Sequence, residues 1–454
     1  MKQQIKLSIF LILFPVLLHA QWISQVTGLP NASILFDISI TDSNTVWGIP
    51  FDGTIVLGEG SLPFFTKTTN GGNLFTVESF PNGYGWSNIS AIDENTAWVG
   101  AIDNITYDGA IFKTTDGGTT WNDQASGIVY DTNSYLNFIH FWNANEGVAV
   151  GDPNPNEFEI YTTSDGGSTW TVVPDSLIPD RESSGEFGIF KNYCVVGNNI
   201  WFGTNKARLY HSDDKGLTWN VLSTGIPTPS LFDYIDFTFW NVNEGIARKY
   251  RESNQSNTHV VKTADGGLTW NPVTVSGTLF GGSFVGLSYI PGTTSTLLSS
   301  GISLPKAGTS YSNDGGTTWT TIDTLVQHYV TKFLNSTTGW SAGISQNATT
   351  GGIYKFSGFP LGLNNPKNGK EISFNLYPNP SDGNFTIQLN NAENSNVSIS
   401  VYNIVGKNVF ENNFGKVGEF FIKTLDLSGL SGGIYLYELR NENRVIKSGK
   451  IILK

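Results

Sequence analysis

The chain has 454 residues and a formal net charge of −12, and this charge is unevenly distributed. Residues 21–365 contain 14 basic and 30 acidic side chains, a net of −16, whereas residues 366–454 contain 10 basic and 8 acidic ones, a net of +2. Because so acidic a surface repels phosphate groups, the main body is not expected to bind nucleic acid. All 13 tryptophans lie at or before Trp340, and this change in composition predicts a domain boundary near residue 360.

Residues 1–20 have the pattern of a secretory signal peptide. Two lysines precede an apolar run, Leu7–Leu18, and Ala20 precedes the expected cleavage point. The run is shorter than the roughly 20 residues that span a bilayer. The sequence therefore predicts an exported protein with no transmembrane segment after removal of the signal. Its single cysteine, Cys194, excludes an internal disulfide.

Beyond the signal, an eight-residue pattern, S/T-x-D-x-G-x-T-W, recurs five times after a worn first copy, TTNGGNLF, at residues 68–75. We call each of the six copies a box. The boxes begin at positions 68, 114, 163, 212, 263 and 312, so they lie 46 to 51 residues apart. A fixed period of this size indicates a repeat architecture. Each repeat also contains alternating runs of Val, Ile, Phe, Trp and Thr between Gly and Asn, which predict β-strands. Four strands in about 49 residues make one blade of a β-propeller.

Seven pairs of such strand runs exist against six boxes, and the N-terminal segment accounts for the difference. The seventh unit stops at Gly351–Phe356 and lacks the strand that follows a box. Gln21–Pro30 aligns with Thr218–Pro227, which does follow a box, with Trp, Thr, Gly and Pro in matching positions. We therefore expect a seven-bladed propeller over residues 21–356, closed by the strand of Trp22, which removes an open sheet edge.

The repeated pattern resembles the Asp-box (BNR) repeat of sialidases, sortilin-type receptors, xyloglucanases and photosystem II assembly-factor-like propellers. Its residue types suggest a tied turn: the carboxylate accepts backbone N–H groups across Asp-Gly-Gly, and the tryptophan packs between blades. One acid per blade leaves the acids too far apart to share a substrate, so we interpret the boxes as structural. Their expected structural residues are Asn70, Asp116, Asp165, Asp214, Asp265 and Asp314, with Trp121, Trp170, Trp219, Trp270 and Trp319.

The turns of a blade alternate between its two ends, so the boxes mark one rim of the propeller. The loops of most varied sequence lie on the opposite rim, and loops on a rigid scaffold commonly carry function. The candidate binding residues expected there are Asp52, Tyr84, Trp86, Asp152, Glu157, Tyr250 and Arg251.

The chain lacks the residues that a sialidase requires, among them three clustered arginines and an F/Y-R-I-P segment near the start. The propeller has four arginines in all: Arg181, Arg208, Arg248 and Arg251. Glycoside hydrolysis by paired carboxylates is the alternative reading, because several acids are expected on rim loops. These acids are Asp52, Asp103, Asp152, Glu157 and Glu159. The histidines show no metal-ligand spacing, so no catalytic, cofactor-binding or metal-binding residue is assigned.

After a linker at 357–372, residues 373–454 contain short alternating strands with Asn and Gly turns, which predict a small Ig-like β-sandwich. This segment closely resembles the type A C-terminal sorting domain of the type IX secretion system of Bacteroidota. The residues that carry the resemblance are Tyr377, Pro378, Asn379, Pro380, Gly433, Tyr435, Lys450 and Lys454. It implies that the type IX machinery is a partner, and that the protein is released or anchored at the outer-membrane surface.

The sequence thus favours an all-β protein, a seven-bladed propeller followed by a sandwich, that is secreted or displayed on the cell surface. We expect a non-catalytic binding or scaffold role toward an extracellular glycan or protein, without a cofactor. Two alternatives stay open: a glycoside hydrolase with paired carboxylates on the rim opposite the boxes, and a self-associating surface-layer protein.

Overall fold

A computed structural model describes most of the chain from residue 21 onward. The described residues are 21–54, 62–124, 130, 134–230, 233–251, 258–282, 286–302, 307–358, 373–390, 395–403, 406–418, 420–441 and 444–454. The predicted signal peptide and all but the first two residues of the predicted linker lie outside them. No helix among the described residues is long and apolar enough to cross a membrane.

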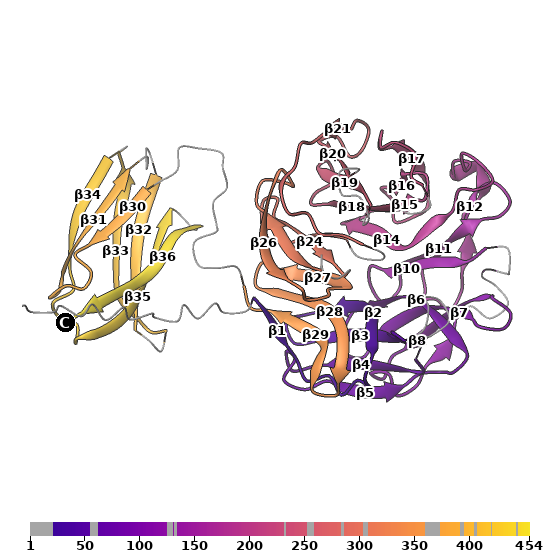
Figure 1. Cartoon of the computed structure of the whole chain (residues 1–454), viewed down its shortest axis with the longest axis horizontal. Helices are drawn as coiled ribbons and strands as arrows, with labels where there is room; N and C mark the ends of the chain where they lie inside the picture. Colours follow the sequence, from indigo (N-terminus) through magenta and orange to yellow (C-terminus); the bar gives the residue numbers. More distant parts are fainter. Residues whose placement is uncertain are drawn as a thin grey trace, which may run out of the picture.

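The antiparallel sheets of residues 22–356 are the blades of a seven-bladed β-propeller, arranged in a ring (Figure 1). Blade one comprises β2 (Ser33–Ile40), β3 (Val46–Asp52), β4 (Phe64–Thr68) and β5 (Thr76–Ser79). Blade two comprises β6 (Tyr84–Ala91), β7 (Ala97–Asp103), β8 (Gly109–Thr114) and β9 (Asn122–Asp123). Blade three comprises β10 (Leu136–Phe141), β11 (Gly147–Pro153), β12 (Phe158–Thr163) and β13 (Thr171–Val172). Blade four comprises β14 (Gly188–Val196), β15 (Asn199–Thr204), β16 (Arg208–Ser212) and β17 (Asn220–Ser223). Blade five comprises β18 (Tyr234–Phe239), β19 (Gly245–Tyr250), β20 (His259–Thr263) and β21 (Asn271–Pro272).

Blades six and seven depart from this simple plan. Blade six contains β23 (Leu287–Tyr289), β24 (Leu297–Gly301), β25 (Gly308–Ser312) and β26 (Thr318–Thr324), and a fifth strand, β22 (Ser276–Gly277), pairs with the outer edge of β26. Blade seven contains β27 (Val330–Asn335), β28 (Thr338–Asn347), β29 (Thr350–Phe356) and, as its fourth strand, β1 (Trp22–Ser24). A short 3₁₀ helix, η1 (Asp175–Leu177), lies between blades three and four.

Contacts between first strands close the ring. The first strand of each blade contacts the first strand of the next, and β27 contacts β2. β1 pairs antiparallel with β29, with Trp22 opposite Phe356. Strands from the two ends of residues 22–356 therefore lie in the same blade.

The core lies between neighbouring blades. Second strands are covered on both faces, so they are apolar runs rather than alternating ones; β7, with the sequence AWVGAID, is buried along its first five residues. Aromatic rings join adjacent blades: Trp98 stacks on Phe141 at 3.8 Å, and Trp201 stacks on Phe239 at 4.1 Å. Flat blades with large rings between them form a rigid body that holds the loops at both rims.

The C-terminal unit is a β-sandwich. One sheet contains β30 (Ser373–Tyr377), β31 (Asn384–Asn390) and β34 (Phe420–Asp426), and the other contains β33 (Asn408–Val417), β32 (Ser395–Tyr402), β35 (Gly433–Asn441) and β36 (Arg444–Leu453). Apolar side chains from both sheets, such as Ile387, Ile399 and Leu439, form its core. The all-β fold class expected from the sequence is confirmed.

Candidate functional site

Each box is a turn closed by its own side chains. In blade two, Thr114 Oγ1 accepts a hydrogen bond from the N–H of Gly118 at 2.9 Å, and Asp116 accepts from the N–H and the hydroxyl of Thr120 at 2.9 and 2.6 Å. The same bonds recur around Asp165, Asp214, Asp265 and Asp314. In the first copy, Asn70 still accepts the N–H of Leu74 at 3.0 Å. These acids therefore bind their own turns.

Electrostatics agree with that role. Hydrogen bonds from Thr120 lower the pKa of Asp116 to about 2, and bonds from Thr169 and Thr269 lower the pKa of Asp165 and Asp265 to about 2. A carboxylate held in its charged form by local N–H and O–H donors is a poor proton donor at neutral pH.

The box tryptophans pack between blades. Trp219, Trp270 and Trp319 each donate Nε1–H to the carbonyl of a glycine in their own box at 2.9 Å. Trp121 lies against Phe65 of blade one at 5.5 Å. Trp219 shares a buried cluster with Phe138 and Val148 of blade three.

A second set of contacts between blades was not expected from the sequence. Lysines on the third strands donate to backbone carbonyls in the next blade's box: Lys67 to Gly117, Lys113 to Gly166, Lys262 to Asp314 and Lys355 to Gly71, at 2.5, 2.9, 3.4 and 2.6 Å. Each ammonium also lies over a tryptophan of its own blade, 4.4 to 5.9 Å from the ring centroid. Burial lowers the pKa of Lys67, Lys113 and Lys262. The available sequence signal was a lysine directly before the box in three of the four cases.

Two aromatic residues expected on the exposed rim lie inside the propeller instead. Trp86 is 7% exposed and donates Nε1–H to the carbonyl of Pro50 at 2.6 Å, and Tyr250 is 2% exposed within β19. The reason is that β6 and β19 extend to these positions, so their side chains alternate into the spaces between blades. Tyr84 is half-buried against Phe112, at 4.8 Å between ring centroids.

The charged rim candidates do not converge on one point. Asp52 accepts from the N–H and hydroxyl of Thr54, and these bonds lower its pKa. Arg251 forms an ion pair with Asp233 at 2.7 Å, which lowers the pKa of Asp233 to about 2. Each of these charges is engaged by a local partner.

Asp152 and Glu157 differ from the rim candidate Asp52 because their pKa values are raised rather than lowered. Burial raises the pKa of Asp152, although it accepts hydrogen bonds from Asn137 Nδ2 and the N–H of Gly188 at 2.8 and 2.9 Å. Burial also raises the pKa of Glu157, and a hydrogen bond with the Asp180 side chain contributes. Among the described residues, no group of three or more His, Cys, Asp or Glu side chains could hold a metal ion.

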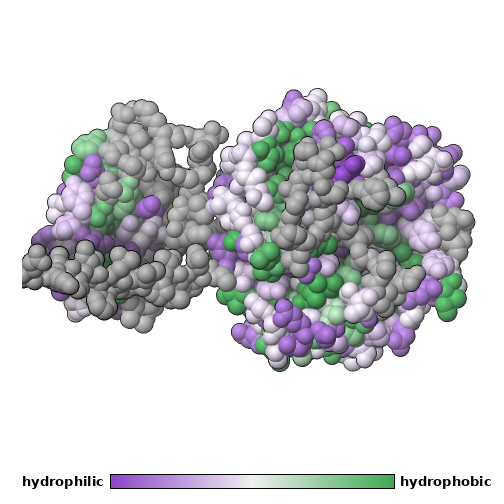
Figure 2. Space-filling model, in the orientation of Figure 1, coloured by the Kyte–Doolittle hydropathy of each residue, from purple (hydrophilic) through white to green (hydrophobic). Residues whose placement is uncertain are grey.

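Exposed apolar and aromatic side chains gather on the same rim, a set that the sequence analysis did not select. We call Ile105, Tyr107, Tyr135 and Phe187 the rim aromatic patch; they are 86, 52, 39 and 49% exposed. The rings of Tyr107 and Tyr135 meet edge to face at 6.5 Å. Figure 2 shows hydrophobic areas between hydrophilic ones on the propeller face turned to the viewer. The available signal was Ile105 and Tyr107 in the short loop between the second and third strands of blade two.

Hydrogen bonds to two aspartates hold the rim aromatic patch in place. Asp103 accepts the N–H groups of Ile105 and Thr106 at 2.8 and 2.9 Å, which fixes the loop that carries Tyr107. The N–H of Asp152 donates to the carbonyl of Tyr135 at 3.0 Å, and the Asp152 carboxylate binds the N–H that follows Phe187. The patch therefore spans blades two, three and four on a preorganised backbone.

Side chains from the first strands of different blades contact one another. Lys332 of blade seven forms an ion pair with Asp37 of blade one at 2.8 Å, and Asn88 of blade two donates to the Tyr193 hydroxyl of blade four at 3.2 Å. Lys191 of blade four donates to the carbonyl of Phe36 in blade one. It adopts φ 57° in a bulge of β14, which redirects its side chain. Burial lowers the pKa of Lys191 to about 8.

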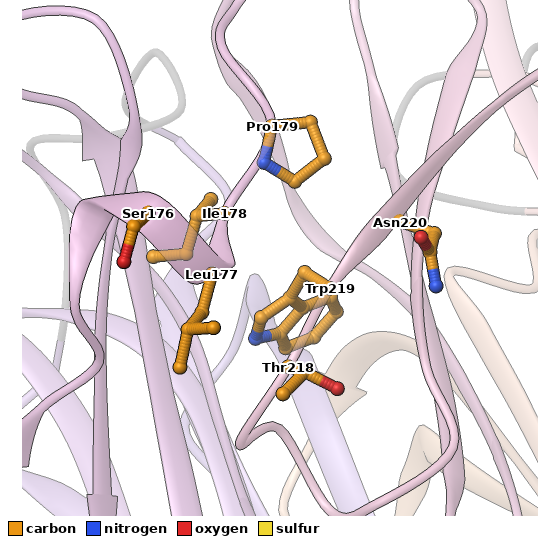
Figure 3. Close-up of a pocket in the computed structure, with 7 residues that line it drawn as sticks. All are labelled: Ser176, Leu177, Ile178, Pro179, Thr218, Trp219 and Asn220. Carbon is orange, nitrogen blue, oxygen red and sulfur yellow. The ribbon is translucent and has the colours of Figure 1, made fainter.

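A pocket of about 310 Å³ lies on the outer side of the ring, between η1 and the start of β17 (Figure 3). It is lined by Ser176, Leu177, Ile178, Pro179, Thr218, Trp219 and Asn220. Of these, Trp219 is almost covered at 4% exposed, whereas Leu177 is 41% exposed.

In the sandwich, residues that carry the sequence resemblance join its two ends. Asn379 Nδ2 donates to the carbonyl of Lys450 at 2.7 Å, and the N–H of Ile452 donates to Asn379 Oδ1 at 2.9 Å. Gly433 pairs with Leu453, and the Tyr435 hydroxyl donates to the carbonyl of Ser431 at 2.8 Å. The side chains of Tyr377 and Lys454 are exposed.

Comparison with known proteins identifies the C-terminal unit. Residues 375–454 match the family described as the secretion system C-terminal sorting domain. No curated protein matches the chain significantly. The chain thus carries a sorting domain of the type IX secretion system, which implies export to the cell surface or release.

Solved structures resemble the propeller. YCF48 bound to D1 peptide is 16% identical, with 74% of this chain and 96% of that chain covered and a TM-score of 0.51. The GH74 xyloglucanase of Xanthomonas campestris is 11% identical, with 87 and 85% covered and a TM-score of 0.33. A Hadza microbial sialidase is 14% identical, with 74 and 66% covered and a TM-score of 0.38. At 16% identity the likeness to YCF48 shows the fold alone, a β-propeller.

Proposed function

We propose that this exported propeller is a non-catalytic binding or scaffold protein for an extracellular glycan or protein. The rim aromatic patch supports the proposal. Tyrosine rings offer apolar faces with a polar edge, which suit sugar rings and peptide side chains. A preorganised surface also loses little conformational entropy when it binds.

The position of the patch adds support. The box turns use their own polar groups, whereas the opposite rim presents Ile105, Tyr107, Tyr135 and Phe187 to solvent. Exposed aromatic side chains that meet, as Tyr107 and Tyr135 do, commonly mark an interaction site. YCF48, which shares the fold, is described with a bound D1 peptide, so a propeller of this kind is able to carry a binding surface.

Glycan arrays and extracellular-protein pull-downs with the full chain test this function. The double variant Tyr107→Ala with Tyr135→Ala should weaken binding about tenfold or more. The control is Leu268→Ala, which removes a side chain that is 75% exposed on a box turn and should change nothing. Turnover of a polysaccharide, or binding that the double variant leaves intact, would contradict the proposal.

One observation favours glycoside hydrolysis as a second candidate. The raised pKa of Asp152 suits a general acid, which must be protonated before it donates to a leaving group. This candidate predicts release of reducing sugar from a polysaccharide, abolished by Asp152→Asn and retained by Asp52→Asn.

We also propose that the sorting domain is removed after export, leaving the propeller free or anchored at the surface. This proposal rests on the resemblance of residues 373–454 to type A sorting domains. Intact-mass measurement of the exported protein tests it, since a mature form that keeps residues 373–454 would contradict it.

A further inference from the structure

The outermost strands of blades four and six each form a backbone hydrogen bond with a neighbouring segment, but only in blade six does that segment form a further strand. In blade six, β22 runs parallel to β26, with Ser276 opposite Thr318 and Gly277 opposite the box residue Trp319. The N–H of Ser276 donates to the carbonyl of Thr317 at 2.9 Å. The chain therefore covers this sheet edge with an extended segment of its own.

Blade four has one equivalent backbone bond at its outer edge but no fifth strand. The N–H of Trp219, the equivalent box residue, donates to the carbonyl of Leu177 at 2.9 Å. The next residues turn away, because the N–H of Ile178 bonds to Asp175 within η1 and Pro179 has no N–H. Since alternate residues of a strand point the same way, the N–H of Val221 faces outward like that of Trp219.

The pocket occupies the place that the missing strand would take. It lies beside Trp219 and Asn220 and is bounded by Ile178 and Pro179 (Figure 3). In blade six, Val273, Val275 and Leu279, which flank β22, pack against the cluster that contains Trp319. The pocket lies beside the matching tryptophan of blade four, and the side chain of Leu177, 41% exposed, gives it an apolar wall that an apolar side chain can contact.

Acidic side chains flank this edge. Asp175 precedes the pocket-lining residues and Asp180 follows them, and both charges contribute to the raised pKa of Glu157, after its burial. The neighbouring cations are engaged: Arg208 pairs with Glu186 at 2.9 Å, and Arg181 Nη1 donates to the carbonyl of Ser184 at 3.2 Å. The local charge therefore complements a basic ligand.

We propose that the outer edge of β17 and the adjacent pocket bind an extended basic segment of a partner protein, as a fifth strand of blade four. The partner's backbone bonds to the carbonyl of Trp219 and the N–H of Val221, and an apolar side chain enters the pocket. A lysine or arginine lies near Asp175 and Asp180. This is β-strand addition, in which backbone bonds supply affinity and pockets supply specificity. It is a second interaction surface, separate from the rim aromatic patch.

The test uses a random nonapeptide phage library selected on the immobilised full chain. Peptides with lysine or arginine beside an apolar residue should be enriched, and their synthetic forms should slow hydrogen exchange at residues 219–223. Val221→Pro removes the outward N–H at an edge position that tolerates proline, and should weaken binding about tenfold or more. The matched control is Val172→Pro at the equivalent position of β13, which should bind normally.

A pocket-filling variant keeps the test decisive if Val221→Pro does not fold. Asn220→Trp changes an exposed side chain and should also block the peptides. The double variant Asp175→Asn with Asp180→Asn should weaken basic peptides and leave neutral ones unchanged. Absence of enrichment, equal binding by the Asn220 and Val221 variants, or protection elsewhere in the chain would overturn the proposal. A dimer that Val221→Pro dissociates would assign the edge to a second copy and overturn it as well.

Discussion

The ammonium of Lys67 lies 2.5 Å from the carbonyl oxygen of Gly117 and 4.4 Å from the ring centroid of Trp47. One side chain thus joins the third strand of blade one to the box of blade two. Equivalent bonds from Lys113, Lys262 and Lys355 make this a repeated device of the propeller. The box turns are therefore closed by their own side chains, and their backbone carbonyls also accept hydrogen bonds from lysines of the neighbouring blade.

Substitution of Lys67 by methionine should lower the free energy of unfolding by about 1–3 kcal/mol, because the Gly117 carbonyl loses its ammonium donor. Chemical denaturation followed by tryptophan fluorescence measures the change. The control is Lys215→Met, which removes a partly exposed ion pair with Glu146 at 2.6 Å and should cost about 1 kcal/mol or less. A larger loss in the control would contradict the role of the bond between blades.

Ring closure through the N-terminal strand predicts a large effect at Trp22. This side chain is 6% exposed, donates Nε1–H to Thr309 at 3.0 Å and meets Phe356 at 5.2 Å. Trp22→Ala should destabilise the propeller by about 3–5 kcal/mol. Ile23→Ala in the same strand, at a side chain 50% exposed, is the control and should change stability by about 0.5 kcal/mol or less. Equal effects would mean that β1 does not secure the ring.

The boxes predict acid sensitivity below about pH 4. Hydrogen bonds lower the pKa of Asp116, Asp165 and Asp265 to about 2 from 3.8. A depressed acid pKa contributes stability that is complete above the unfolded value and is lost as the pH falls toward the folded value. Asp116→Ala should lower the melting temperature at pH 7 more than at pH 2, and Asp116→Asn should be milder, since Asn70 serves in the first copy. An unchanged deficit at pH 2 would contradict this account.

His140 predicts a second titration at higher pH. Burial, with the charge of Lys332, lowers its pKa to about 3 from 6.5. The unfolded chain therefore binds one more proton between these values, and stability falls as the pH decreases from 6.5, by about 1.4 kcal/mol per unit for one group. His140→Gln should reduce this slope. Unfolding free energies of the variant and of the unchanged protein at pH 4.5 and 7 measure the change, and an equal slope in both would contradict this account.

The sorting domain predicts a role for Asn379 in holding β36. Asn379→Ala removes the bonds to Lys450 and Ile452 and should destabilise the sandwich by about 1–2 kcal/mol. It should also reduce the exported fraction of the protein in a native host. Asn396→Ala, at an exposed position of β32, is the control. Normal export of a destabilised Asn379 variant would contradict this prediction, since it would mean that the secretion machinery recognises the domain whatever its stability.

Much of the fold was predictable because it depends on local rules. Asp-Gly-Gly turns at a fixed period define blades, and seven strand pairs against six boxes indicated a shared last blade. Residues 375–454 match a sorting domain as expected. The rim was harder to predict. Trp86 and Tyr250 were expected there and are buried. The strands β6 and β19 extend to include these residues, and how far a strand extends depends on its packing against the neighbouring blade.

The sequence alone determined the repeat and the all-β class, since turns and strands depend on residues close together in the chain. It also determined the means of export, through the motifs of the C-terminal segment. Only the tertiary structure decided which side chains meet. Lys67 and Gly117 are 50 residues apart, Asn88 and Tyr193 are 105 apart, and both pairs join different blades. It also decided that the carbonyl of Leu177, in η1, accepts the N–H of Trp219 at the outer edge of blade four. Such contacts depend on how rigid blades pack, and no local pattern encodes that.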